Sequence, residues 1–230
     1  MSLFQIPTHP DVPVIGESQG YPVRRIFCVG RNYADHAIEM GGVPDLEAPF
    51  YFTKSPAHLC LTGATVPYAP GTSDLHHEME LVVALGTPAF RVNKDDALGM
   101  VYGYACGLDM TRRDRQQDGK DKRRPWSLGK DFEDAAVIAP LTKAADFGPV
   151  EKQAITLSVN GDTRQSATLD LLLHSIPAVI EHLSQYYHLG PGDLIYTGTP
   201  AGVGAVQEGD HLHGEIDGLT PIDLTIGKAE

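Results

Sequence analysis

The chain has 230 residues and 42% hydrophobic content, which is enough to bury a full core in one enzyme-sized domain. Its formal net charge of -12 at pH 7 argues against nucleic acids and anionic membranes as partners, because both bind basic surfaces. Its three cysteines show no Cys-x-x-Cys spacing and leave one unpaired in any disulfide scheme, which fits a reducing cytoplasm.

Residues 1–22 are rich in Pro and Gly without a sustained period, and we expect them to form an N-terminal arm or edge strand. The chain begins without a charged leader and apolar stretch, and no segment reaches the ~20 apolar residues needed to cross a bilayer. A soluble, cytoplasmic protein is therefore expected, with residues 23–230 as a single domain.

Short apolar runs that alternate with turns predict strands at 25–29, 50–52, 78–85, 101–108, 155–159 and 194–196. The 24 glycines and 17 prolines favour a turn-rich fold, mainly β with a few helices. Asn160-Gly161 predicts a hairpin, since this pair tolerates the positive φ angles of tight turns. Two helices are expected, at 34–40, stopped by Gly41-Gly42, and at 178–187, capped by Ser175 and ended by Gly190.

Glu78 and Glu80 are two residues apart on a predicted strand, so their side chains should point to the same face. Asp109 ends the next apolar run and could join them if the two strands are neighbours. Two buried like charges are costly unless a cation neutralises them, and three carboxylates suit Mg²⁺ or Mn²⁺. The alternative is a strand whose acids meet solvent or arginines.

His36 and Glu39 are three residues apart on the first predicted helix and therefore share one face. A carboxylate hydrogen-bonded to an imidazole fixes its tautomer and raises its basicity, as activation of a water requires. A surface pair without a catalytic role is the alternative.

The stretch 112–130 is strongly basic, with eight Lys or Arg residues opposed by three Asp. It could attract a small anionic carboxylate substrate, with two or three of its side chains reaching it, or be a solvated loop. Residues 198–204, Gly-Thr-Pro-Ala-Gly-Val-Gly, lack the order of a Walker A or dinucleotide motif. They form either a plain loop or a turn whose amides and Thr199 hydroxyl face a small anion.

Five blocks in order along the chain resemble the fumarylacetoacetate hydrolase family, especially its short single-domain acylpyruvase branch, over residues 23–227. The blocks are Gly-Arg-Asn-Tyr-Ala-Asp-His at 30–36, His-Glu-Met-Glu-Leu at 77–81, Leu-Asp-Met-Thr at 108–111, Pro-Trp-Ser-Leu-Gly-Lys at 125–130 and Thr-Gly-Thr-Pro-Ala-Gly-Val-Gly at 197–204. The resemblance implies a mixed β-sandwich roll, a single catalytic domain over 23–230, a homodimer, and Mg²⁺ or Mn²⁺ held by Glu78, Glu80 and Asp109.

The resemblance also implies roles for side chains. His36, backed by Glu39, would deprotonate a water that attacks the distal carbonyl, and Lys130 and Gln116 would stabilise the developing oxyanion and position the water. Substrate oxygens would be held by Arg31, Arg113 and Thr199. The helix that carries His36 would order on ligand binding, with Gly41-Gly42 as a hinge. Asn32, Tyr33 and residues 41–48 are candidates for the distal pocket.

The activity expected from this resemblance is Mg²⁺-dependent hydrolysis of a C–C bond in a small 2,4-dioxo acid to pyruvate and a carboxylic acid, with fumarylpyruvate of aromatic catabolism as a candidate substrate. Three alternatives remain open. They are oxaloacetate decarboxylation, a related isomerisation or decarboxylation in aromatic catabolism, and a non-catalytic metal-binding or ligand-sensing protein that has kept the fold.

Overall fold

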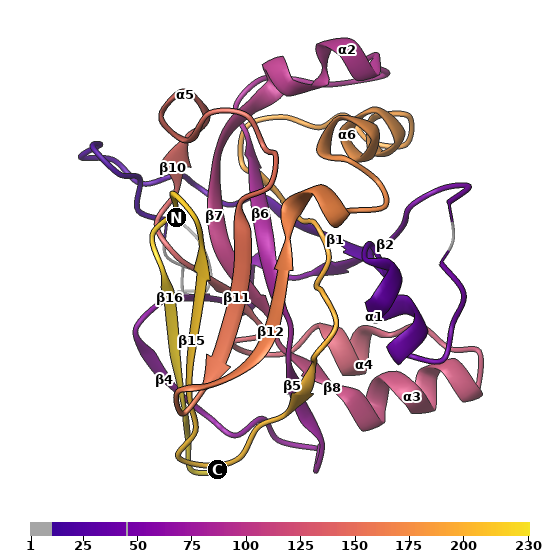
Figure 1. Cartoon of the computed structure of the whole chain (residues 1–230), viewed down its shortest axis with the longest axis vertical. Helices are drawn as coiled ribbons and strands as arrows, with labels where there is room; N and C mark the ends of the chain where they lie inside the picture. The colour runs from indigo at the N-terminus through magenta and orange to yellow at the C-terminus, as the bar shows by residue number, and fades with distance from the viewer. Residues whose placement is uncertain (1–10, 45) are drawn as a thin grey trace, which may run out of the picture.

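The computed structural model describes residues 11–44 and 46–230, and its strands form three sheets (Figure 1). The largest is a mixed sheet in the order β2 (Phe50–Lys54), β1 (Arg25–Gly30), β13 (Asp193–Tyr196), β6 (Met79–Leu85), β7 (Val101–Asp109), β9 (Ala136–Ile138) and β3 (Leu59–Leu61), with β10 (Thr142–Lys143) paired to β7. The second runs β12 (Asp162–Thr168), β11 (Ala154–Val159), β15 (His211–Ile216), β16 (Ile222–Gly227) and β4 (Ala64–Pro67). A small third sheet contains β14 (Gly204–Ala205), β5 (Leu75–His77) and β8 (Thr111–Arg112).

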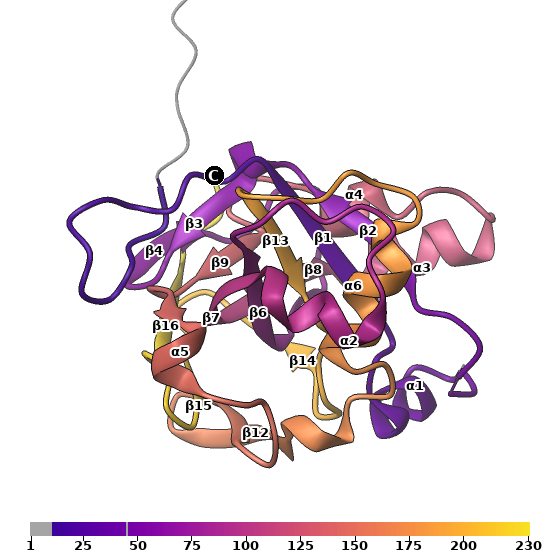
Figure 2. The same cartoon turned by 90° about the horizontal axis from the view of Figure 1, so that it is seen from above.

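The helices are short and lie outside the sheets, at the top and on the right in Figure 1 (Figures 1 and 2). The α-helices are α1 (Ala34–Glu39), α2 (Lys94–Ala97), α3 (Arg113–Asp121), α4 (Ser127–Lys130), α5 (Ala144–Phe147) and α6 (Ile176–Ser184). Single 3-10 turns are η1 (Pro56–His58), η2 (Leu98–Met100) and η3 (Leu169–Leu171). In both views α2 lies beside α6, and in Figure 1 α1, α3 and α4 lie below α6 on the same side of the sheets.

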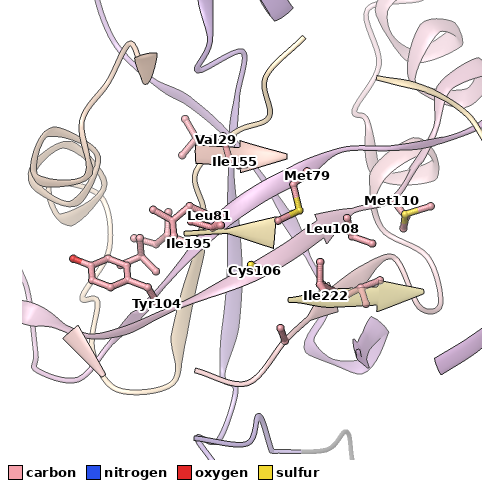
Figure 3. Close-up of a cluster of buried hydrophobic side chains, with 14 of the residues drawn as sticks. Val29, Met79, Leu81, Tyr104, Cys106, Leu108, Met110, Ile155, Ile195 and Ile222 are labelled. Carbon is pink, nitrogen blue, oxygen red and sulfur yellow. The ribbon is translucent and has the colours of Figure 1, made fainter. Parts of the chain in front are cut away.

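The main core lies between the two large sheets, and alternation along β6 explains its position. Met79, Leu81 and Val83 point toward the second sheet, where they share a buried cluster with Ile155 and Ile222 (Figure 3). The opposite face of the same strands is also apolar along most of its length, where β1, β6, β7 and β13 pack under the N-terminal segment. Every residue of β6 is buried, which explains its nearly continuous apolar sequence.

The opposite face turns polar at one end of β6 and β7. There Glu80 and Asp109 occupy positions that Val82, Ala84 and Ala105 fill farther along the strands. The candidate site is therefore built on rigid, doubly covered strands.

The predicted fold class is confirmed: the chain is mainly β with mixed sheets and a few short helices. All six predicted strands are present within a few residues of the expected bounds, and Asn160 and Gly161 form the β11–β12 turn with φ of 54° and 85°. Both predicted helices exist. The prediction that Gly190 ends the second one is wrong, because α6 ends at Ser184.

The basic stretch 112–130 is not one solvated loop, because it contains α3 and α4. Residues 11–23 pack on the large sheet, with Val12 paired to Tyr21 and Val14 to Leu141. The expected division of the chain at residue 22 stays a prediction, and residues 1–10 of that arm lie outside the described part. The three cysteines are buried and unpaired with one another. Within the described ranges, no helix is long and apolar enough to span a membrane.

Candidate active site

Three buried carboxylates meet at the polar end of β6 and β7. In the antiparallel register Glu80 lies opposite Gly107, and the Asp109 amide donates to the Glu78 carbonyl over 2.9 Å. Carboxylate oxygens of Glu78, Glu80 and Asp109 lie within 4.8 Å of one another, and none of the three residues is more than 4% exposed. Glu78 is not in a strand as expected, since it occupies the break between β5 and β6 where the chain changes sheets. The convergence of the three acids nevertheless matches the prediction.

Three cations surround two of these acids. The ammonium nitrogen of Lys130 lies 2.7 Å from Glu78 and 2.8 Å from Asp109. A guanidinium nitrogen of Arg113 lies 2.5 Å from Glu78, and Lys54 lies 2.8 Å from Asp109. Burial alone would raise the pKa of Glu78, but Lys130 and Arg113 outweigh burial and hold that pKa well below its usual value. Glu78 is therefore ionised.

Glu80 has a different environment. Among the described residues it has no Lys or Arg partner, and its carboxylate accepts one hydrogen bond, from the Gly198 amide over 2.8 Å. Burial, followed by repulsion from Asp109 and Glu78, raises the pKa of Glu80 well above its usual value. A divalent cation between the three acids would remove this repulsion. The donors are all oxygens, as hard ions such as Mg²⁺ and Mn²⁺ prefer, so the residues fit a metal site of this kind.

The contact to Glu80 depends on a glycine. Gly198 has a φ of 102°, and a Cβ at this position would lie 2.7 Å from the Cβ of Asn32. Only a residue without a side chain can therefore turn its amide toward Glu80 here. Asn32 holds this segment in turn, because its side-chain amide donates to the carbonyls of Thr197 and His174 over 2.8 and 3.0 Å.

His36 and Glu39 form the expected pair on α1, with Nδ1 of His36 3.1 Å from Glu39 Oε2. A carboxylate oxygen only accepts, so Nδ1 carries the hydrogen and Nε2 has a free lone pair. The other Glu39 oxygen accepts from the Gly202 amide over 3.0 Å, which ties α1 to the loop after β13. Burial lowers the pKa of His36 below its usual value, although nearby Glu78 and the bond to Glu39 act against this shift. His36 is therefore neutral at pH 7.

Helix α3 supplies two more predicted residues from one face. Arg113 and Gln116 are three residues apart, and a guanidinium nitrogen of Arg113 donates to Gln116 Oε1 over 2.7 Å. Both residues are buried. Arg113 is already engaged by Glu78 and Gln116, whereas the Gln116 amide nitrogen makes no hydrogen bond within the described ranges and can donate to a ligand.

The predicted residues line one cavity or lie directly behind it. The lining includes Arg31, His36, Glu78, Glu80, Arg113, Gln116, Lys130 and Thr199. Glu39 lies behind His36, and Asp109 lies behind Lys130. Asn32 and Tyr33 are not among the residues that line this cavity, and their expected place in the distal pocket stays a prediction. Asn32 anchors the Gly198 turn, and residue 45 of the segment 41–48 lies outside the described residues.

Sequence reasoning missed Lys54 and Gln165. Gln165 on β12 is fully buried; its amide nitrogen donates to the Thr199 hydroxyl over 2.7 Å, and its oxygen accepts from the Met79 amide over 3.0 Å. Lys54 ends β2, where a lysine after an apolar run is an ordinary surface pattern. Neither residue belongs to a recognisable sequence motif, because its ion-pair or hydrogen-bond partners are more than 30 positions away in the chain. Phe52, Lys120 and Trp126, which also line the cavity, were not singled out individually either.

The family model for the fumarylacetoacetate (FAA) hydrolase C-terminal domain matches residues 25–227. The chain belongs to this family. The resemblance on which the site was predicted is thereby confirmed, over nearly the range expected.

Individual relatives give a more specific comparison than the family model. A fumarylpyruvate hydrolase from Ralstonia sp is 54% identical over 185 residues, which cover 80% of this chain and 96% of that protein. The mitochondrial oxaloacetate tautomerase of Homo sapiens is 37% identical over 207 residues, covering 90% of this chain and 93% of the relative. A crystal structure of fumarylpyruvate hydrolase from Pseudomonas aeruginosa, in complex with Mn²⁺ and pyruvate, matches with a TM-score of 0.95 and 41% identity over 99% of this chain and all of that one.

Proposed function

We propose that this protein is a Mg²⁺- or Mn²⁺-dependent hydrolase that cleaves the C–C bond of a 2,4-dioxo acid, with fumarylpyruvate as the substrate. Water adds across the bond, so that fumarylpyruvate and water give fumarate and pyruvate. The observation that carries the proposal is the presence of a neutral His36–Glu39 pair and a three-carboxylate cluster in one cavity of a chain 54% identical to a fumarylpyruvate hydrolase.

The bound cation would polarise the α-keto acid and stabilise the enolate of the leaving pyruvate. The protein supplies the proton transfers. Nε2 of His36 accepts a proton from the attacking water, and Glu39 stabilises the imidazolium that results. The free amide nitrogen of Gln116 donates to the water or to the developing oxyanion.

The remaining predicted residues hold the substrate and the acids. Lys130 donates to Glu78, Asp109 and the Thr111 hydroxyl, so in this arrangement its three N–H groups keep the carboxylates in place. Its predicted role at the oxyanion stays a prediction, as does that of Arg113 toward the substrate. Arg31 and the Thr199 hydroxyl face the cavity, and we assign them to substrate carboxylate or keto oxygens.

A spectrophotometric assay tests the proposal with fumarylpyruvate, acetylpyruvate and oxaloacetate, before and after chelation. We expect hydrolysis of fumarylpyruvate to stop after chelation and to return with Mg²⁺ or Mn²⁺, and the metal that restores kcat/KM better is the assigned cofactor. Hydrolysis that survives thorough chelation, or that neither ion restores, would refute the metal-dependent mechanism.

Oxaloacetate chemistry is the second candidate, because relatives 36–37% identical to this chain are oxaloacetate tautomerases. Tautomerisation and decarboxylation of oxaloacetate need no attacking water. His36→Ala should therefore abolish hydrolysis while reducing decarboxylation less, and keto–enol conversion is followed in the same assay by ultraviolet absorbance. Faster turnover of oxaloacetate than of either acylpyruvate by the wild-type protein would favour the second candidate.

We further propose that the protein is a cytoplasmic homodimer. The dimer rests on the family resemblance and the cytoplasm on three cysteines that form no disulfide with one another. Light scattering of the purified protein gives its mass in solution, and fractionation of the source cells gives its location.

A further inference from the structure

The cavity has two cationic regions, and they differ in whether their side chains form ion pairs with acids. Around the carboxylates, Arg113 and Lys130 are bound to Glu78 and Asp109. Lys120 and Arg31 also line the cavity, yet within residues 11–44 and 46–230 neither side chain forms an ion pair with an acid. Two unpaired cations that line a cavity suit an anionic group of the ligand.

Helix α3 determines where Lys120 lies. Arg113, Gln116 and Lys120 are at positions i, i+3 and i+7, so all three face the cavity from one side of the helix. At 1.5 Å per residue, the Cα of Lys120 lies about 10 Å along the axis from that of Arg113. The helix therefore places one cation at the carboxylate cluster and another two turns away from it.

Trp126 holds the Lys120 side chain at this place. The ammonium group lies 5.5 Å from the centre of the indole ring, which packs edge-on against Phe50 at 5.5 Å. Gly119 permits the approach, because a Cβ there would already lie 3.3 Å from Trp126 Cδ1. Burial, followed by repulsion from Arg31 and Arg113, lowers the pKa of Lys120 to about 8, so the ammonium form gains from an anionic partner.

The backbone at Arg31 is also held in place. Its φ of 56° lies in the left-handed region that few residues other than glycine adopt. The next residue, Asn32, holds this conformation through its side-chain bonds to residues 174 and 197. The guanidinium group is close to Gly42, where an added Cβ would meet its Nη1 at 3.1 Å.

We propose that Lys120, together with Arg31, binds the carboxylate at the far end of the substrate and so selects dianionic 2,4-dioxo acids over monoanionic ones. This inference rests on the proposed function and names the substrate class of the same site. With the α-keto acid at the carboxylate cluster, the fumaroyl group extends along α3 beside Trp126 and Phe52. Its terminal carboxylate then reaches Lys120, which is a specificity-determining residue and takes no part in bond cleavage.

The test compares Lys120→Met with wild type on fumarylpyruvate, which carries two carboxylates, and on acetylpyruvate, which carries one. Loss of a charge-assisted bond should lower kcat/KM for fumarylpyruvate by about 10- to 100-fold, mainly through KM. The value for acetylpyruvate should stay within about 3-fold, and Lys120→Arg should restore most of the loss on fumarylpyruvate.

Lys122→Met is the matched control, since Lys122 is exposed on the same segment, and it should leave both substrates unchanged. Mn²⁺ binding to each variant, measured by electron paramagnetic resonance, reports an intact site independently of turnover. An equal loss on both substrates, or no loss on fumarylpyruvate, would overturn the role of Lys120. Failure of the wild-type protein to hydrolyse either substrate would instead refute the proposed function, so the two failures are distinguishable.

Discussion

At the scale of single residues, the three carboxylates of the cluster have different electrostatic roles although they share one face. Glu78 is matched by Lys130 and Arg113, whereas in the part of the chain that the structure describes Glu80 accepts a hydrogen bond only from the Gly198 amide. Glu80 is therefore the acid whose charge most requires a bound cation.

We predict opposite effects of Glu80→Gln on the metal-free and metal-loaded protein. Without metal, the variant should be at least as stable as wild type, because it removes repulsion from Asp109 and Glu78. With Mn²⁺, it should lose the stabilisation that wild type gains, which is about 2.7 kcal/mol at 100 times Kd. Thermal unfolding with and without Mn²⁺ measures both, and exposed Glu208→Gln is the control. Full Mn²⁺ stabilisation of Glu80→Gln would contradict the assignment of Glu80 as a ligand.

The second prediction at this scale concerns the pH dependence that His36 imposes. Its pKa is lowered below 6.5, so the base form persists below that pH and the acid limb of kcat/KM should fall below pH 6.5. The hydrogen bond that His36 donates to Glu39 raises the pKa of His36, so Glu39→Gln should move the acid limb to still lower pH while reducing the plateau rate. Rate profiles from pH 4.5 to 8 measure both effects. An acid limb that moves upward in Glu39→Gln would contradict the pairing.

At the scale of elements, the sequence predicted several with a clear apolar period, but not the alternating strand β16 or the helix α3, which has no such period. The strand at 79–85 is buried on both faces and the helix at 176–184 has an apolar face, so both were recognised. Helix α3 has no apolar face: its buried residues are Arg113, Gln116 and Gly119, which a periodicity argument takes as loop. Polar contacts of Arg113 and Asp114 with residues 72–78 stabilise the helix, and contacts across this distance in the chain leave no local pattern in the sequence.

Gln165 shows how one strand supports the site from a distance. Gln165→Leu would leave the buried Met79 amide and Thr199 hydroxyl without their partner, so we expect a loss of about 1–3 kcal/mol in the free energy of unfolding. Because Met79 lies between the two glutamates, Mn²⁺ affinity should fall as well. Urea unfolding and Mn²⁺ titration measure these effects, and exposed Ser166→Ala on the same strand should change neither. Unchanged stability in Gln165→Leu would show that these bonds contribute little.

At the scale of the whole molecule, the fold class and the site followed from the sequence for different reasons. Strand alternation and turn residues predicted a mainly β chain, and the ordered motifs predicted which distant segments meet. The packing of the sheets against each other, the break at Glu78 and the roles of Lys54 and Asn32 depend on contacts between segments far apart in the chain. A single sequence contains no record of such contacts, so they could not be predicted.

Buried histidine makes the stability of the whole protein sensitive to acid. Burial lowers the pKa of His77 to about 4, against 6.5 in an unfolded chain, so between these values the unfolded state binds the extra proton. Stability should therefore fall as the pH drops from 6.5 to 4, by up to about 3 kcal/mol from this residue. His77→Gln should lose less stability than wild type over that interval, as urea unfolding at pH 7 and pH 4.5 would show. Parallel losses in the two proteins would contradict this source of acid sensitivity.

The two oxygens of Glu39 have separate partners, the imidazole of His36 and the amide of Gly202. Glu39, which orients the base His36, therefore also connects the α1 segment to the loop after β13. If the α1 segment moves on ligand binding, as the family resemblance implies, the imidazole of His36 moves with it, away from the carboxylate cluster. An open α1 segment would then leave the site without its base, so hydrolysis is expected only when the Glu39–Gly202 contact is formed.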